Sequence, residues 1–197
     1  MHFVEDNLYH IYNRGNNRQP IFFTPKNYLF FLHKVRRYIK PYCHLLAYCL
    51  MPNHFHFLIQ ATSASTVLTH TQLGSRTALS EGVKNLLSSY TQAINKQEIR
   101  TGSLFAQNTK AKLVSHRETE IDYSLLCLNY IHQNPLRAGL VQEVKDWPYS
   151  SFPDYAHLRR GTLCEKEITY GLIDADWTHF TDFSAEILPE GVDQKLY

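Results

Sequence analysis

The order in which strand-like and helix-like spacings of apolar residues alternate is the feature that most limits how this chain can fold. Four segments have strand character: 8–14, 44–50, 54–60 and an irregular stretch at 103–114. Two helical segments separate them: 25–39, after the N-cap residue Thr24, and 83–99. This β-α-β-β-α-β order is the split βαβ pattern of ferredoxin-like folds. We therefore expect an α+β protein whose antiparallel sheet carries helices on one face.

Three further segments complete the expected organisation. Residues 61–80 are rich in Ser and Thr and predict a long surface loop. Residues 118–134 predict a third helix, which ends at Asn134-Pro135 because the residue before proline avoids the α region. We expect residues 1–152 to form one domain and residues 153–197 to form an irregular C-terminal extension.

The composition of the 197 residues, 44% hydrophobic and 19% charged, is typical of a globular protein. No apolar run is long enough to cross a bilayer, and residues 1–10 lack the basic and apolar regions of a signal peptide. The four cysteines form no CxxC pair, so we expect reduced thiols and a cytoplasmic protein without a membrane partner. A net charge of +2 neither indicates nor excludes nucleic acid as a partner.

His54 and His56 lie two residues apart in a segment expected to be a strand. Side chains at i and i+2 point to the same face of a strand, so two imidazoles about 7 Å apart along it can converge on one cation. Phe55, between them, is expected to point into the core. On its own, such a pair is more often two unrelated histidines than a metal site.

Tyr130 and Asn134 lie four residues apart in the expected third helix. Because positions i and i+4 are neighbours on one helix face, the hydroxyl and the amide can face the same point. Asn134 offers a carbonyl oxygen as a metal ligand, and Tyr130 offers an oxygen nucleophile. This pair alone also fits ordinary packing. His132 should point to another face, where we expect a structural role.

Taken together, these residues belong to blocks that resemble the hallmark motifs of single-tyrosine HUH (His-hydrophobe-His) transposases, in particular the REP-associated tyrosine transposases. The blocks are His10-Ile-Tyr-Asn-Arg-Gly15, Met51-Pro-Asn-His-Phe-His56 and Tyr130-Ile-His-Gln-Asn-Pro-Leu-Arg-Ala-Gly-Leu-Val141. A further block of that group is similar to Trp147-Pro-Tyr-Ser-Ser151. The resemblance covers roughly residues 8–152, with the blocks in the same order.

The resemblance implies an endonuclease and strand transferase that nicks and rejoins single-stranded or hairpin DNA during DNA transposition. By that likeness His54 and His56 are metal ligands for Mg²⁺ or Mn²⁺, and Tyr130 is the nucleophile. Asn134 stands where the wider superfamily often has glutamine, and its shorter side chain leaves either direct ligation or a bridging water open. Attack by Tyr130 would leave a 5′-phosphotyrosine and a free 3′-hydroxyl that can reverse the step without ATP. One tyrosine per chain is compatible with a monomer or a homodimer.

Several residues are candidates for DNA contact. The resemblance places His10, Asn13 and Arg14 in the first motif strand, although His10 fits a hydrogen-bonded histidine of the sheet equally well. Phosphate contacts are predicted for four basic residues outside that strand: Arg100, Lys110, Lys112 and Arg137. Each of the four also fits an ordinary solvated charge.

Two other functions fit parts of the pattern. A zinc hydrolase would use His54 and His56, with His10 as a third ligand. A protein descended from a transposase would grip hairpin DNA without cutting it. The intact His54, His56 and Tyr130 favour catalysis over this second alternative.

Overall fold

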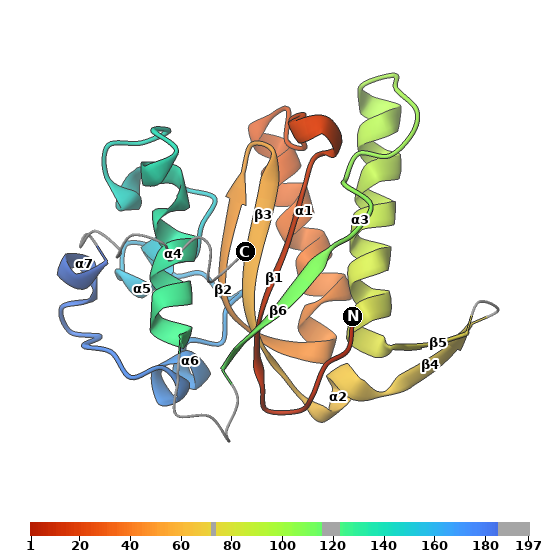
Figure 1. Ribbon diagram of the computed structural model, residues 1–197. Coiled ribbons are helices and arrows are strands. Elements are labelled where there is room, and N and C mark those ends of the chain that lie inside the picture. The colour runs from red at the N-terminus through yellow and green to blue at the C-terminus, as the bar shows by residue number, and fades with distance from the viewer. Residues whose placement is uncertain (72–73, 116–122, 185–197) are drawn as a thin grey trace.

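A four-stranded antiparallel sheet forms the centre of the molecule (Figure 1). The computed structural model describes residues 1–71, 74–115 and 123–184. The strands are β1 (Leu8–Arg14), β2 (Cys43–Met51), β3 (His54–Ala61) and β6 (Lys110–Ser115), in the order β2-β3-β1-β6. This is the strand order expected for a split βαβ fold, so the predicted fold class is confirmed.

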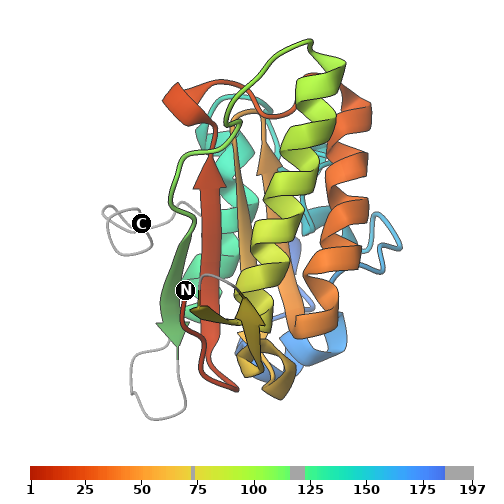
Figure 2. The same ribbon diagram turned by 90° about the vertical axis from the view of Figure 1, so that its right-hand side faces the viewer.

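Two helices, α1 (Pro25–Tyr38) and α3 (Ala78–Gln97), cover one face of the sheet, as Figure 2 shows. Thr24 begins α1 with a capping box, and Pro25 occupies the first turn. Phe31 of α1 packs against Phe55 of β3 and Tyr90 of α3, with ring centroids 5.4 and 4.9 Å apart. We call this apolar layer the first core.

The third long helix, α4 (Ser124–Arg137), lies on the opposite face of the sheet (Figure 1). The prediction that helices occupy one face is therefore correct for α1 and α3 and wrong for α4. The physical reason is that β2 and β3 are buried along nearly their whole length, so both of their faces need a covering layer. Leu128 and Ile131 of α4 pack with Leu46 and Leu58 of the sheet in what we call the second core.

The end of α4 also differs from the prediction. Pro135 lies inside the helix, which continues to Arg137. A proline this close to the end of a helix removes only one late hydrogen bond, so the last turn still forms. The stop is at Gly139, whose φ of +67° suits the left-handed position that ends many helices. Residues 118–122 of the predicted helix lie outside the described residues, and Tyr123 directly precedes the helix.

The loop predicted at 61–80 is wrong as a description of that segment. It contains α2 (Ser63–Thr66), the hairpin of β4 (Leu68–Thr71) and β5 (Gly74–Thr77), and the start of α3. Thr77 caps α3, because its hydroxyl accepts the backbone N–H of Ser80 at 3.4 Å. The segment is therefore ordered, with Thr62 and Thr77 at the starts of helices and other Ser and Thr residues in the hairpin strands.

The predicted strand at 103–114 forms only in its second half, as β6. Before it, the Asn13 amide nitrogen donates to the carbonyl oxygen of Ala106 at 3.1 Å and to the Thr109 hydroxyl at 2.9 Å. Backbone pairing here is limited to an isolated bridge between Gly15 and Phe105, so residues 103–109 cross the end of β1 as an irregular segment that the Asn13 side chain helps to hold. Short 3₁₀ turns lie elsewhere in the chain: η1 (Asn16–Arg18), η2 (Lys40–Tyr42) and η3 (Val144–Asp146).

The described residues after α4 pack against β2 and α4. They include three short helices: α5 (Phe152–Tyr155), α6 (Lys166–Leu172) and α7 (Phe180–Phe183). Tyr155, Ile173 and Phe180 are buried in the second core. The division of the chain after Phe152 stays a prediction, but the described residues beyond that point supply part of this core.

His132 has the structural role expected for it. Its Nε2 lies 2.8 Å from the Ser151 hydroxyl oxygen, which also accepts the backbone N–H of Tyr48 at 2.9 Å. The histidine thus links α4 through Ser151 to β2.

The four cysteines are free thiols and all are buried. Cys43 and Cys164 lie in the first core, whereas Cys49 and Cys127 lie in the second. Within residues 1–71, 74–115 and 123–184, no helix has the length and apolar character needed to span a membrane.

Candidate nuclease site

His54 and His56 share the face of β3 that is covered by α4. Their ring centroids lie 4.9 Å apart, with the ring planes nearly perpendicular. Phe55 points the other way and is fully buried in the first core. The alternation expected from the sequence therefore holds, because every second side chain of a strand faces the same side.

Helix α4 brings Tyr130 and Asn134 to these two histidines. The Tyr130 ring lies edge-on to His56, with the centroids 5.7 Å apart, and Asn134 makes a side-chain hydrogen bond with His54. The Asn134 amide nitrogen also donates to the Tyr130 carbonyl oxygen at 2.8 Å, which anchors the amide to its own helix. Two segments about 75 residues apart in the chain thus meet at one point. Tyr130 and Asn134 both face that point because residues four apart share one face of a helix.

Burial keeps both imidazoles neutral near pH 7. Desolvation lowers the pKa of His54, and a side-chain hydrogen bond with Asn134 opposes that shift. Desolvation lowers the pKa of His56 well below its usual range, and the nearby His10 and His54 lower it further. Since a metal binds the unprotonated nitrogen of imidazole, both rings are in the state that metal ligation requires.

The donor set of His54, His56 and Asn134 fits a divalent metal that accepts nitrogen and amide oxygen ligands. Two neutral imidazoles and an amide side chain approach one another in a largely buried site. Within the part of the chain that the structure describes, no group of three His, Cys, Asp or Glu side chains is placed to hold a metal. The donor set is therefore a mixed one, unlike the sets typical of zinc hydrolases.

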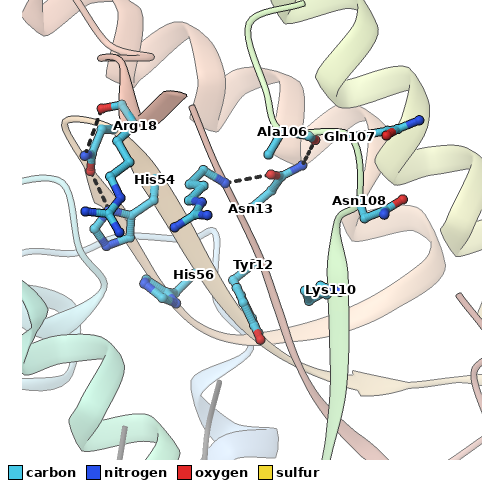
Figure 3. Close-up of a pocket in the computed structure, with 11 residues that line it drawn as sticks. Tyr12, Asn13, Arg18, His54, His56, Ala106, Gln107, Asn108 and Lys110 are labelled. Carbon is cyan, nitrogen blue, oxygen red and sulfur yellow. Dashed lines mark hydrogen bonds between the residues drawn. The ribbon is translucent and has the colours of Figure 1, made fainter. Parts of the chain in front are cut away.

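A cavity of about 660 Å³ opens beside the two histidines (Figure 3). Its walls come from β1, β3, η1, the first residue of β6 and the segment before it. The aromatic and basic residues of the lining are Tyr12, Arg14, Arg18, His54, His56 and Lys110. Tyr12 pairs across the sheet with His56 on one side and with Lys110 on the other, so these three side chains form a row on one face.

Arg14 and Lys110, both predicted to contact DNA, are exposed and line this cavity. Asn13 also lines it, but its side-chain amide is already hydrogen-bonded within the protein. Its amide oxygen accepts the backbone N–H of Arg14 at 2.7 Å, and its amide nitrogen bonds Ala106 and Thr109. Asn13 therefore shapes the wall near Arg14 (Figure 3).

The other predicted phosphate contacts lie at different distances from the site. Lys112 pairs with His10, two residue pairs further along β6 from the Lys110 row. Arg137 is exposed and places its guanidinium carbon 5.6 Å from the centroid of the Tyr130 ring. Arg100 follows α3, where it donates to the Ser103 carbonyl oxygen at 3.3 Å, and it does not line the cavity.

His10 is fully buried, and its Nε2 lies 2.8 Å from Nδ1 of His56. Of the two alternatives for this residue, the structure matches the hydrogen-bonded histidine of the sheet. His10 faces the Nδ1 edge of the His56 ring, so it lies behind His56 as seen from that ring's Nε2.

The sequence interpretation missed three residues of the site: Tyr12, Arg18 and Asn53. Tyr12 had a usable signal, because it alternates with Asn13 in the expected strand and so points to the opposite face. The structure shows that this face is the one of His56, with which Tyr12 pairs. Asn53 stands inside the second motif, next to His54. Arg18 reaches the cavity from η1, whose Asn17 and Arg18 have positive φ values that the sequence pattern does not indicate.

Comparisons with known proteins agree with the resemblance. No family model matches the chain. A Haemophilus influenzae protein that carries the provisional name REP-associated tyrosine transposase is 26% identical over 107 residues, covering 54% of this chain and 57% of that protein. The REP-associated tyrosine transposase of Escherichia coli is 36% identical over 59 residues, covering 29% of this chain and 28% of that protein. The matches thus span less than two thirds of each relative.

A solved structure of a REP-associated tyrosine transposase bound to a REP hairpin has a TM-score of 0.60 to this chain. The match covers 92% of this chain and 93% of that one, at 14% sequence identity. At this identity the match shows a shared fold. The fold and both curated relatives therefore show that this chain is similar to REP-associated tyrosine transposases.

Proposed function

We propose that this protein is a transposase-type endonuclease that nicks and rejoins single-stranded hairpin DNA through a 5′-phosphotyrosine intermediate. The observation that carries the proposal is the meeting of Tyr130 and Asn134 of α4 with His54 and His56 of β3. The similarity to REP-associated tyrosine transposases supports it, as does the REP hairpin bound in the structural neighbour.

The reaction follows from the positions of these side chains. The Tyr130 hydroxyl oxygen attacks the scissile phosphorus and gives its proton to solvent, and the bond from phosphorus to the 3′-oxygen breaks. The leaving 3′-oxygen takes up a proton and becomes a free hydroxyl. Because the new phosphotyrosine bond is again a phosphodiester, the same hydroxyl can attack it and rejoin the strand. A divalent metal would withdraw charge from a non-bridging oxygen of the phosphate.

The residues around Tyr130 have separate tasks in this proposal. His54, His56 and Asn134 would hold the metal, and Arg137 beside the Tyr130 ring would attract the scissile phosphate. Arg14 and Lys110 would contact phosphates of the strand that leads through the cavity. A cavity of about 660 Å³ suits an unpaired nucleotide or two, whereas a stacked duplex is too wide to enter it.

The two alternatives have less support. A zinc hydrolase needs a third nitrogen, sulfur or carboxylate ligand, and His10 faces the Nδ1 edge of His56 rather than joining a common centre. A protein that only binds DNA has no need for a tyrosine next to two neutral imidazoles.

The test uses single-stranded DNA hairpins with randomised flanks, incubated with the protein and Mn²⁺ and resolved on a denaturing gel. If the proposal holds, a label at the 3′ end moves with the protein, because the 5′ phosphate of the downstream piece is attached to tyrosine. A label at the 5′ end appears on a shorter free strand. A chelator should abolish both products, and a fully paired linear duplex should give neither.

The labels also separate the proposal from its alternatives. Retarded DNA on a native gel without any covalent product would favour the protein that only binds. Two free cleavage products without a protein adduct would favour hydrolysis and contradict the tyrosine mechanism.

A further inference from the structure

The side chain of Asn53 is held between two partners next to the candidate metal site. Its amide nitrogen donates to the backbone carbonyl oxygen of Arg18 at 3.3 Å, and its amide oxygen lies 2.6 Å from Nδ1 of His54. Its backbone is fixed as well, because the carbonyl oxygen of Asn53 accepts the N–H of Gly15 at 2.7 Å. The amide group therefore has a defined position.

These partners decide which way round the Asn53 amide lies. A backbone carbonyl only accepts hydrogen bonds, so the group facing Arg18 is the NH₂ of Asn53. The amide oxygen then faces His54, and this oxygen also only accepts. The Asn53 oxygen therefore favours the tautomer of the neutral His54 ring that carries its proton on Nδ1, which leaves the lone pair on Nε2.

His56 is held in a different way. Its Nδ1 faces Nε2 of His10, and either of two imidazole nitrogens can donate to the other. The tautomer of His56 can therefore exchange together with that of His10. His54 also contacts the Asn134 side chain, but the Asn53 oxygen, which only accepts, lies 2.6 Å from Nδ1, so this contact favours the Nδ1–H form.

We propose that Asn53 is a positioning residue that fixes the Nδ1–H tautomer and the ring orientation of His54, so that Nε2 is presented for metal binding. The metal-binding half of this inference rests on the proposed function, whereas the tautomer half does not. Groups that hold the second nitrogen of a metal-binding histidine typically change metal affinity by about 10- to 100-fold when they are removed.

The experiment measures the tautomer and the metal affinity separately. Nitrogen-detected NMR of ¹⁵N-histidine protein in chelator, at a pH above 7, reports which ring nitrogen of His54 carries the proton. Titration calorimetry with Mn²⁺ alone reports binding without DNA or turnover. We expect wild type to show a single Nδ1–H form for His54. Asn53→Ala should mix the tautomers and weaken Mn²⁺ binding by about 10- to 100-fold.

Two further variants make the comparison specific. Asn53→Asp keeps an acceptor next to Nδ1, so it should retain the Nδ1–H form and bind Mn²⁺ at least as well as Asn53→Ala does. Asn16→Ala removes an exposed amide from the neighbouring turn and should leave both measurements unchanged. If Asn53→Ala does not fold, Asn53→Asp still decides, because an Nε2–H form in that variant overturns the proposal.

The outcomes separate this inference from the proposed function. A wild-type protein that binds no Mn²⁺ would contradict the metal site of the proposed function, and the NMR comparison would still decide the tautomer. Unchanged tautomer and unchanged Mn²⁺ affinity in Asn53→Ala would overturn the role of Asn53 and leave the metal site standing.

Discussion

The two faces of the sheet are built from different chemistry. The first face carries Phe55 and Phe57, which pack with Phe31 of α1 and Tyr90 of α3 in a layer of aromatic and aliphatic side chains. The second face has apolar residues as well, but it also holds the fully buried His10 and His56, and His132 is fully buried in the helix α4 that covers it. Both faces belong to the same strands, so alternate residues of β1 and β3 contribute to the apolar layer and to the polar site.

The difference indicates how stability and chemistry are divided. Burying an aromatic side chain stabilises the fold without a polar cost. A buried imidazole must be hydrogen-bonded and loses the ability to take up a proton, as the lowered pKa of His56 and His132 demonstrates. We therefore infer that the first face supplies most of the stability that the second face needs for its polar site.

The largest expected effect is on the second face. Tyr130→Phe should reduce formation of the covalent DNA adduct by about 10⁴-fold or more, because it removes the hydroxyl oxygen that forms the bond to phosphorus. The loss of one hydroxyl should lower the free energy of unfolding by only about 1 kcal/mol. Adduct yield on denaturing gels and urea unfolding measure the two quantities. Tyr170→Phe, in α6, is the matched control, and a persistent adduct in Tyr130→Phe would refute the nucleophile assignment.

A substitution in the first face should have the opposite pattern, with a large effect on stability and a small one on activity. Phe31→Ala should lower the free energy of unfolding by about 3–5 kcal/mol, because it leaves a cavity among Phe22, Phe55 and Tyr90. Adduct formation per folded molecule should stay close to wild type. Urea unfolding, with activity measured at low temperature, tests this. A folded Phe31→Ala protein without activity would show that the first face contributes to the chemistry as well as to stability.

A third test uses pH, with a chelator present to keep metals out of the measurement. Burial lowers the pKa of His132 from 6.5 to about 3. Below pH 6.5 the unfolded chain takes up a proton on this residue while the folded chain does not, so the folded state loses stability as pH falls. Between pH 6.5 and 4.5 this amounts to about 2–3 kcal/mol.

The variant for this test is His132→Phe, which removes the titrating group. Its curve of unfolding free energy against pH should be flatter than that of wild type by that amount, and the difference should be largest at the acidic end. Parallel curves would mean that His132 is protonated in the fold and that its apolar surroundings of Phe152 and Phe180 open readily.

The smallest effect concerns the charged edge of the second face. Lys110→Ala with Lys112→Ala should flatten the slope of log affinity against log salt for one hairpin by one to two units, at about 0.7 for each phosphate that is no longer neutralised. The cleavage position should not move. Because Lys110 lines the cavity and Lys112 pairs with His10, the single change Lys110→Ala should account for most of the effect. An unchanged slope would place the strand nearer Arg14 and Arg137.

Local patterns in the sequence predicted much of this arrangement. The i, i+2 spacing of His54 and His56 and the i, i+4 spacing of Tyr130 and Asn134 follow from strand and helix geometry alone. The bounds of β1 were predicted as the structure has them. These features depend on periodicities that a single segment carries by itself.

The features that were missed depend on partners distant in the chain. Helix α4 continues through Pro135, which lies in its last turn and is buried, and residues 103–109 keep only an isolated bridge to the end of β1 and the bonds from the Asn13 side chain. No local pattern indicates that His10 would meet His56, 46 positions away. Long-range contacts of this kind override local preferences, so they need the fold before they can be seen.

The even distribution of the four cysteines gives each layer of the molecule its own chemical reporter. Burial raises the pKa of all four thiols, so a thiol-modifying reagent reacts only in molecules that have opened around the cysteine in question. Cys43 and Cys164 report on the first core, and Cys49 and Cys127 report on the second. Rates of modification, followed residue by residue by mass spectrometry, would therefore give separate opening free energies for the two layers.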